Sequence, residues 1–175
     1  MGFSIKQWLY QGKLKQKLNS LRTSKVPSEN PGNTIALVYS DQDDLKTIQQ
    51  LKKDLKRQHK RTFDLIFKNS KVVVDPEEET ETFSLKNVNW YGWPNSTAVE
   101  VFQRQQYDIL LLLNTSDLPI FHHLLQTTSA FLKIGYKSYA EHLHLIIDGQ
   151  GEISTKELVQ RIQSTLLALQ PKERA

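Results

Sequence analysis

Polar side chains that can bind an anion follow several apolar runs of the sequence. Ser40, Asn114 and Tyr136 each end such a run, and Thr115 and Ser116 come directly after Asn114. Hydroxyl and amide groups donate hydrogen bonds, and backbone amides before a helix can hold a phosphate. These five residues therefore predict a site for a small anionic ligand, such as a nucleotide or a sugar phosphate.

The turn at residues 114–117 also has a purely structural interpretation. It contains no glycine, so it matches neither the P-loop nor the dinucleotide-binding fingerprint. Asp117 is an ordinary residue to cap a helix, and Pro119 suits a first helical turn. We therefore weigh a simple strand-to-helix connection against the ligand site.

Residues for catalysis or metal binding are not arranged in a recognisable pattern. His122 and His123 are adjacent and would point about 100° apart on a helix, whereas His142 and His144 alternate as on one face of a strand. Neither pair is accompanied by the further ligands that a zinc site needs, and no Gly-x-Ser-x-Gly motif is present. The sequence thus predicts no catalytic residue, no metal and no cofactor.

The strongest charge signal lies in residues 1–26, which contain six cations and no acid, while the whole chain carries +4. This segment reads as an amphipathic helix that could contact phosphates, lie on an anionic membrane, or pack on the domain with its lysines solvated. A second basic cluster follows, which also suits the end of a helix. The residues predicted to contact RNA are Lys6, Lys13, Lys15, Lys17, Arg22, Lys52, Lys53, Lys56 and Arg57.

Aromatic residues concentrate in the segment from Asn89 to Pro94. Such a segment can line an interface, and Trp8, Trp90 and Trp93 are the candidates for one. It can equally plug the open edge of a small sheet. Gly92 is expected to supply a turn with positive φ.

The elements that would position these residues alternate between strands and helices. Strands are expected at 35–39, 63–67, 109–113, 131–134 and 143–147, with a short strand at 72–74 and an edge strand or turn at Phe83 and Leu85. Helices are expected around 45–55 (with a stripe of Leu45, Ile48, Leu51 and Leu55), at 96–105, after Pro119, and after the cap Ser154. Unbroken apolar strands alternating with helices indicate an α/β class. We predict a single Rossmann-like three-layer domain with a mostly parallel sheet at 33–170, plus a basic N-terminal helix at 1–26.

Bulk composition narrows the possibilities further. The chain has no cysteine and no apolar run of 18 residues, and no signal peptide is recognisable at its start. These features favour a cytoplasmic protein that neither spans a membrane nor uses thiol chemistry.

Three blocks of the chain together resemble an uncharacterised bacterial family, a domain of unknown function. They are the Asn-Trp-x-Gly-x-Pro motif at 89–94, the Tyr-Asp-hydrophobic strand from Tyr107, and the Lys-x-Gly turn at 133–135. The resemblance implies a Rossmann-like fold and no activity. A second likeness is to the N-terminal half of heptosyltransferase-type glycosyltransferases, whose sugar-nucleotide half has no counterpart here.

Charge asymmetry and the lack of catalytic residues favour one function among several. The expected function is a non-catalytic binding module whose basic helix docks on RNA or a ribosome-like particle. One alternative is a protein or enzyme that binds a small anion at the strand ends, and another is a peripheral membrane protein.

Overall fold

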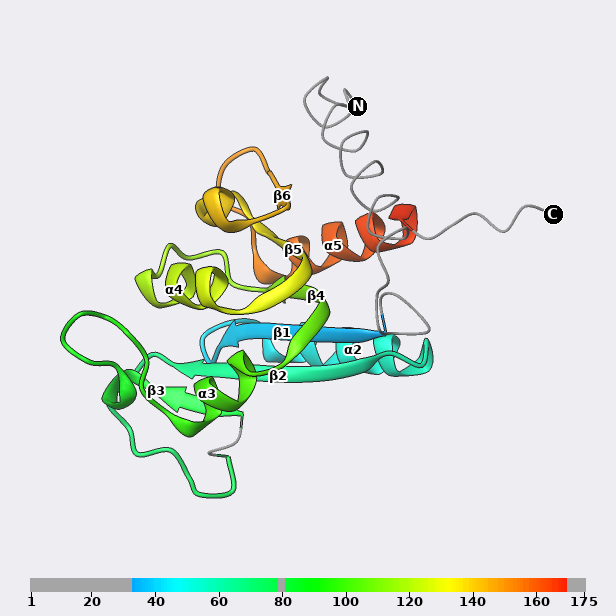
Figure 1. The fold of residues 1–175 in the computed structure, drawn as a ribbon. Coiled ribbons are helices and arrows are strands. Elements are labelled where there is room, and N and C mark those ends of the chain that lie inside the picture. Colours follow the sequence, from blue (N-terminus) through cyan, green and yellow to red (C-terminus); the bar gives the residue numbers. More distant parts are fainter. Residues whose placement is uncertain (1–32, 79–80, 170–175) are drawn as a thin grey trace.

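The computed structural model describes residues 33–78 and 81–169, which form an α/β fold on one sheet (Figure 1). The elements in chain order are β1 (Thr34–Ser40), α2 (Leu45–Arg57), β2 (Arg61–Lys68), β3 (Thr82–Ser84), η1 (Leu85–Asn87), α3 (Thr97–Gln103), β4 (Gln106–Leu112), α4 (Pro119–Thr127), β5 (Ser129–Tyr136), η2 (Lys137–His142), β6 (Leu145–Ile147) and α5 (Thr155–Leu169).

The six strands lie in the order β3-β2-β1-β4-β5-β6, and every pair is parallel. The chain starts at the centre with β1, builds outward through β2 and β3, and then returns to β4 on the other side of β1. This is the strand order of a doubly wound Rossmann-like sheet. The predicted fold class is therefore confirmed, and the sheet is wholly parallel.

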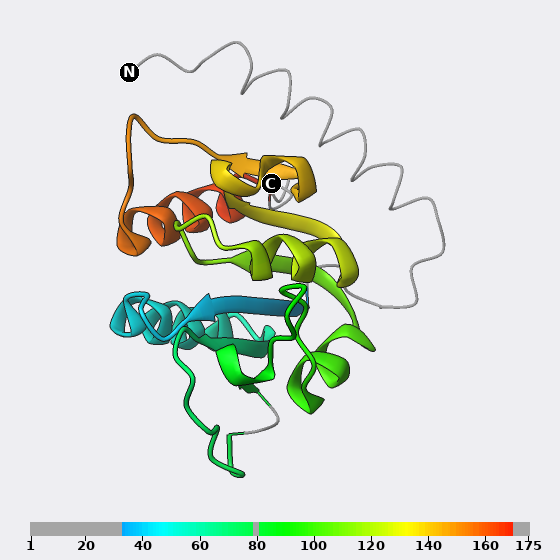
Figure 2. The same ribbon diagram turned by 90° about the vertical axis from the view of Figure 1, so that its left-hand side faces the viewer.

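Helices cover both faces of the sheet (Figures 1 and 2). Strand β1 shows why, since Ile35, Leu37 and Tyr39 point into one core and Ala36 and Val38 into the other. Helices α2 and α5 close the first core, and α3 and α4 close the second. An apolar run that is buried on both faces is what a central parallel strand requires.

Helix α2 buries most of the apolar stripe that was predicted to face the sheet. Asp44 caps its first turn by accepting a hydrogen bond from the backbone N–H of Thr47, and Ile48 and Leu51 are buried. Leu45 was predicted to belong to the same stripe but is 45% exposed. That prediction is wrong, because Leu45 is the first residue of the helix and is not part of the core that buries Ile48, Leu51 and Leu55.

The segment between β2 and α3 departs from the expected strand pattern. Residues 72–74 form no strand, and Val73 is exposed. The edge strand is β3, at Thr82–Ser84, where Phe83 is buried. The Ser84 hydroxyl donates a 2.7 Å hydrogen bond to the Val72 carbonyl, so a side chain ties residue 72 to β3 in place of a strand ladder.

A buried carboxylate joins α2 to β2. Asp64 accepts a 2.8 Å hydrogen bond from the Tyr39 hydroxyl and forms an ion pair with Lys52. Burial, followed by the charge of Asp64, raises the pKa of the Tyr39 hydroxyl. Lys52 therefore neutralises a charge beneath the helix, which is a structural role.

Part of the sequence-based organisation lies outside the described residues. The basic helix predicted at 1–26 falls there, with Lys6, Lys13, Lys15, Lys17, Arg22 and Trp8. Among the residues at 33–78 and 81–169, no helix is long and apolar enough to cross a membrane.

Candidate functional site

A pocket opens at the carboxyl ends of β1 and β4, the two central strands. After β1 the chain winds toward one edge of the sheet, and after β4 it winds toward the other. Open α/β sheets bind their ligands at this topological switch point, because the connections diverge there and leave a crevice. The pocket of about 490 Å³ lies within the range of small-molecule sites.

Asp43 is the structural centre of this pocket. Its carboxylate accepts hydrogen bonds of 3.0 and 3.1 Å from the Asn114 side-chain amide, and one of 3.4 Å from the Thr155 hydroxyl. The backbone N–H of Ser40 donates a further bond of 2.7 Å. One side chain thus ties together the end of β1, the end of β4 and the start of α5.

The electrostatics of Asp43 reflect its half-buried position. Partial burial raises the pKa of the Asp43 carboxyl, and the hydrogen bonds from Ser40, Asn114 and Thr155 oppose that rise. A carboxyl group with a raised pKa at a switch point is typical of a functional site. Its acceptor capacity is already used by protein donors, so it positions the pocket more readily than it binds a ligand directly.

The rest of the lining is polar and comes from three loops. Helix α5 begins here, with Ser154 accepting a 3.2 Å hydrogen bond from the backbone N–H of Glu157. The charge of Lys156 is among the causes that lower the pKa of the Asp44 carboxyl; the largest is its hydrogen bond from the Thr47 hydroxyl. The lining residues are Gln42, Asp43, Asp44, Asn114, Thr115, Ser116, Ser154, Thr155 and Lys156.

The structure brings together part of the predicted ligand set. Asn114, Thr115 and Ser116 line the pocket. Ser40 is buried beneath it, and the Tyr136 hydroxyl donates a 2.8 Å hydrogen bond to the Gly151 carbonyl outside the lining. Neither Ser40 nor Tyr136 lines the pocket, and their role in ligand binding stays a prediction.

Six of the nine residues that line the pocket were not among the predicted ligand residues: Gln42, Asp43, Asp44, Ser154, Thr155 and Lys156. Asp43 precedes the helix cap Asp44, and an acid at the positive end of a helix has a structural explanation of its own. Since Asp44 alone caps the helix, the additional acid Asp43 was a signal in the sequence that could have pointed to another role for this residue. Nothing in the sequence places Thr155 against Asp43, since 112 residues separate them.

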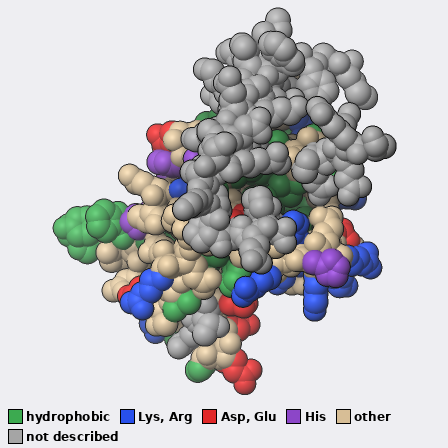
Figure 3. All heavy atoms as spheres, turned by 45° about the vertical axis from the view of Figure 1, so that its right-hand side comes forward, with side chains coloured by type: hydrophobic (Ala, Val, Ile, Leu, Met, Phe, Trp, Pro, Cys, Tyr) green, Lys and Arg blue, Asp and Glu red, His purple; other side chains and the backbone are tan. Residues whose placement is uncertain are grey.

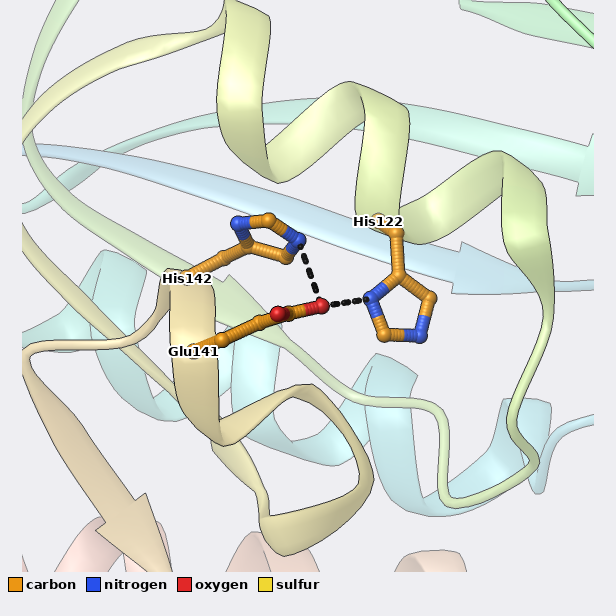
Figure 4. A group of neighbouring side chains, drawn as sticks. All are labelled: His122, Glu141 and His142. Atoms are coloured by element: carbon orange, nitrogen blue, oxygen red, sulfur yellow. Dashed lines mark ion pairs between the residues drawn. The ribbon is translucent and has the colours of Figure 1, made fainter.

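A second polar cluster joins α4 to η2 (Figure 4). The Glu141 carboxylate lies 3.4 Å from His122 Nδ1 and 3.2 Å from His142 Nε2. The other ring nitrogen of His122, Nε2, lies 2.7 Å from Asp117 Oδ1. The sequence suggests the pairs His122 with His123 and His142 with His144, whereas the fold brings together His122 and His142 from two elements.

Two local expectations around this cluster are corrected. Asp117 is not the cap of α4, because Leu118 holds that position without any side-chain hydrogen bond, and Asp117 contacts His122 instead. His144 does not share a face with His142 in a common site. Its Nδ1 accepts a 2.9 Å hydrogen bond from the backbone N–H of Lys133 on β5.

Tyr139 connects the second cluster to the pocket. Its buried hydroxyl accepts a 3.1 Å hydrogen bond from the backbone N–H of Leu118 and donates to the Ser116 carbonyl. Burial raises the pKa of the Tyr139 hydroxyl, so it stays protonated at neutral pH. The loop that carries Ser116 and Asp117 is therefore held by η2.

The aromatic segment folds into a self-supporting turn. The Asn89 side chain accepts 3.0 Å hydrogen bonds from the backbone N–H groups of Tyr91 and Trp93, and Gly92 has φ of +82°, as predicted. Trp90 is 84% exposed and Trp93 57%, so the turn does not plug the sheet edge. The interface role of Trp90 and Trp93 stays a prediction that this exposure permits.

Fold and pocket together define a class: a Rossmann-like α/β protein with a polar crevice at its switch point. A family model matches residues 6–169, which is most of the chain. The protein belongs to the family of unknown function DUF6913. Comparisons with curated proteins and with solved structures found no significant match.

The raised pKa of Asp43 predicts a specific pH dependence of stability. Because its pKa is higher in the folded protein than the ordinary 3.8, the folded state binds this proton more tightly than the unfolded chain. The stability from this group is present at low pH and is lost as the pH rises through the folded pKa. Asp43→Asn cannot ionise, so the free energy of unfolding of the variant minus that of the parent should increase as the pH rises above about 4 and through the raised pKa. Urea denaturation of both proteins across this range measures the difference.

Hydrogen bonds lost in the variant add only a constant offset, so a difference that is flat or falls with pH would contradict this prediction.

The hydroxyl of Tyr139 should contribute measurably to stability. Tyr139→Phe leaves the Leu118 N–H and the Ser116 carbonyl without this partner, which should cost about 1–3 kcal/mol of unfolding free energy. Chemical denaturation of parent and variant measures the loss. The control Tyr91→Phe removes a hydroxyl from a 64% exposed side chain and should change stability by under about 0.5 kcal/mol. Equal effects of the two variants would show that the Tyr139 bonds are not stabilising.

Proposed function

We propose that the protein binds a small phosphorylated ligand rich in hydroxyl groups, such as a nucleotide or a sugar phosphate, in the switch-point pocket. The observation that carries the proposal is the convergence on Asp43 of Asn114 and Thr155, which are 71 and 112 residues away in the sequence. Partial burial of the Asp43 carboxylate is unfavourable, and the hydrogen bonds of this network offset it. The network holds polar residues around the pocket and leaves the pocket open.

The chemistry of the lining matches both parts of such a ligand. Helix α5 begins at the pocket, and its first backbone N–H groups have no intrahelical acceptor, so with Lys156 they favour a phosphate. Thr115, Ser116 and Asp44 supply hydroxyl and carboxylate groups for the hydroxyls of a sugar. A purely anionic ligand fits less well, since Asp43 and Asp44 add negative charge.

Ligand-induced thermal stabilisation tests this proposal directly. A ligand at about 100 times its Kd stabilises the native state by about 2.7 kcal/mol, which raises the Tm by several degrees for a domain of this size. We expect such a shift with at least one member of a panel of nucleotides and sugar phosphates.

Charge reversal separates this pocket from general anion binding. Lys156→Glu should abolish the shift, whereas Lys53→Glu reverses an exposed cation on α2 outside the pocket lining and should preserve it. A flat response of the parent to the whole panel, or equal loss in both variants, would refute the pocket as the site.

A second candidate function is docking on RNA or a ribosome-like particle, in the cytoplasm. The backbone N–H of Arg61 donates a 2.7 Å hydrogen bond to the Asn33 carbonyl, so the described part of the chain begins beside the start of β2, which follows α2. Lys53, Lys56 and Arg57 are exposed there, and Figure 3 shows Lys and Arg side chains gathered on this side of the molecule. These exposed cations support a cationic surface at the end of α2.

The ion pairs of α2 bear on which of the predicted cations could contact RNA. Lys52 forms an ion pair with the buried Asp64, so it is unsuited to the phosphate contact predicted for it. Arg57 pairs with Asp54 at 3.4 Å, but its side chain is 76% exposed, and such a pair is readily exchanged for a phosphate.

Salt dependence of RNA binding tests the docking proposal. Each lost phosphate contact should reduce the slope of log affinity against log salt concentration by about 0.7 for single strands. The triple variant Lys53→Glu, Lys56→Glu and Arg57→Glu should therefore weaken binding and flatten that slope in filter-binding assays. The control Lys71→Glu, an exposed cation after β2, should bind as the parent does.

Cell fractionation separates the remaining alternatives. Co-migration of the full chain with ribosomal particles at low salt, lost at high salt, would support RNA docking. Sedimentation with anionic vesicles but no retention of RNA would instead favour the peripheral membrane alternative. Unchanged RNA binding by the triple variant would remove α2 from the surface.

A further inference from the structure

Three side chains between α4 and η2 have the chemistry and spacing of a metal site. They are His122, Glu141 and His142, whose ligand atoms all lie within 4.8 Å of one another (Figure 4). Glu141 Oε1 stands between the two rings, 3.4 Å from His122 Nδ1 and 3.2 Å from His142 Nε2. Ligand atoms around a tetrahedral ion with bonds of about 2.0–2.1 Å are separated by about 3.3 Å.

The contact of Asp117 fixes which nitrogen of His122 faces this cluster. His122 Nε2 lies 2.7 Å from Asp117 Oδ1, so this nitrogen carries the proton and donates it to the carboxylate. In the neutral ring Nδ1 then presents its lone pair toward Glu141 Oε1, which is also an acceptor. Two facing acceptors repel each other unless a proton or a metal ion lies between them.

The same relation is the usual support of a metal-bound histidine. A ligating imidazole nearly always donates its second ring N–H to a carboxylate or carbonyl, which orients the ring and raises its basicity. Asp117 takes this position for His122, although it is not needed as a helix cap. The buried Tyr139 beside it holds the Asp117 loop against η2, so the ligands come from two elements that are fixed to each other.

We propose that His122, Glu141 and His142 bind one divalent transition-metal ion, with zinc as the best match. Two imidazoles and a carboxylate form a ligand set that zinc uses when a fourth position is left for water or a substrate. Calcium and magnesium take all-oxygen sites and fit this set poorly. Glu141 is 71% exposed and the two histidines are partly exposed, so an ion can enter from solvent.

Metal binding by the untagged full chain tests the proposal. After treatment with a chelator, the protein is titrated with Zn²⁺ against a chromophoric competitor, and with Co²⁺ as a spectroscopic probe. We expect one Zn²⁺ per chain and a visible spectrum of tetrahedral Co²⁺. Glu141→Gln and His142→Ala should each weaken Zn²⁺ binding at least about 100-fold, and Asp117→Asn about 10-fold.

A matched control removes a histidine that is not part of the cluster. His59 is exposed and has φ of +58°, a conformation that asparagine tolerates, so His59→Asn should leave the affinity unchanged. Zn²⁺ should also raise the Tm of the parent and of His59→Asn but not of Glu141→Gln. Glu141 is exposed, so this variant is expected to fold even if His142→Ala does not.

The opposing explanation is that the two rings are protonated and held by Glu141 as ion pairs. In that case Zn²⁺ would fail to bind at one equivalent per chain, or would bind Glu141→Gln and the parent equally, and either result overturns the proposal. No nucleotide or sugar phosphate enters these measurements, so they stand or fall independently of the switch-point pocket.

Discussion

The carboxylate of Asp43 is the interaction on which the functional end of this fold depends. The ladder between the two central strands reaches Val38 and Leu112, and the connections beyond these residues leave in opposite directions, so the ladder does not link those connections. Asp43 supplies this link by accepting hydrogen bonds from Asn114 after β4 and Thr155 at the start of α5. A half-buried carboxylate is costly unless it is fully hydrogen-bonded, and that requirement fixes the pocket wall.

The second constraint is the loop between β4 and α4, which both polar clusters share. Ser116 lines the pocket, while the next residue, Asp117, contacts His122. Tyr139 holds this loop through the Ser116 carbonyl and the Leu118 N–H. Because the buried Tyr139 hydroxyl anchors this loop, the loop can position Ser116 at the pocket and Asp117 at the histidine cluster. The two clusters are mechanically connected even though they use different chemistry.

Most of the fold could be predicted from the sequence because it follows from burial on both faces. The apolar runs of β1, β4 and β5 and the stripes of α2 and α5 require no knowledge of distant contacts. The strand error occurs where a short apolar run has no sheet neighbour. Val72–Val74 has strand-forming residues, yet the edge of the sheet is taken by Thr82–Ser84. Strand pairing at an edge is decided by the length and path of the loop, which periodicity does not report.

The sites were only half predictable for a related reason. The polar residues after β4 were found because they follow a strand, which is a local signal, and Asn114, Thr115 and Ser116 do line the pocket. Asp43, Thr155 and the pairing of His122 with His142 are non-local, and each depends on the order of strands in the sheet.

The pocket and the last turn of α2 lie at opposite ends of the strands, and this separates the proposed functions in space. At the carboxyl edge, acidic and neutral polar groups surround the pocket, with Lys156 as the single lining cation among the described residues. At the amino edge, the end of α2 presents Lys53, Lys56 and Arg57 where the chain enters from its basic segment. A polyanion attracted to the amino edge would leave the pocket open on the other side. Binding of a macromolecule and binding of a small ligand are therefore sterically compatible in one chain, and a coupling between them would have to pass through the parallel strands that join the two edges.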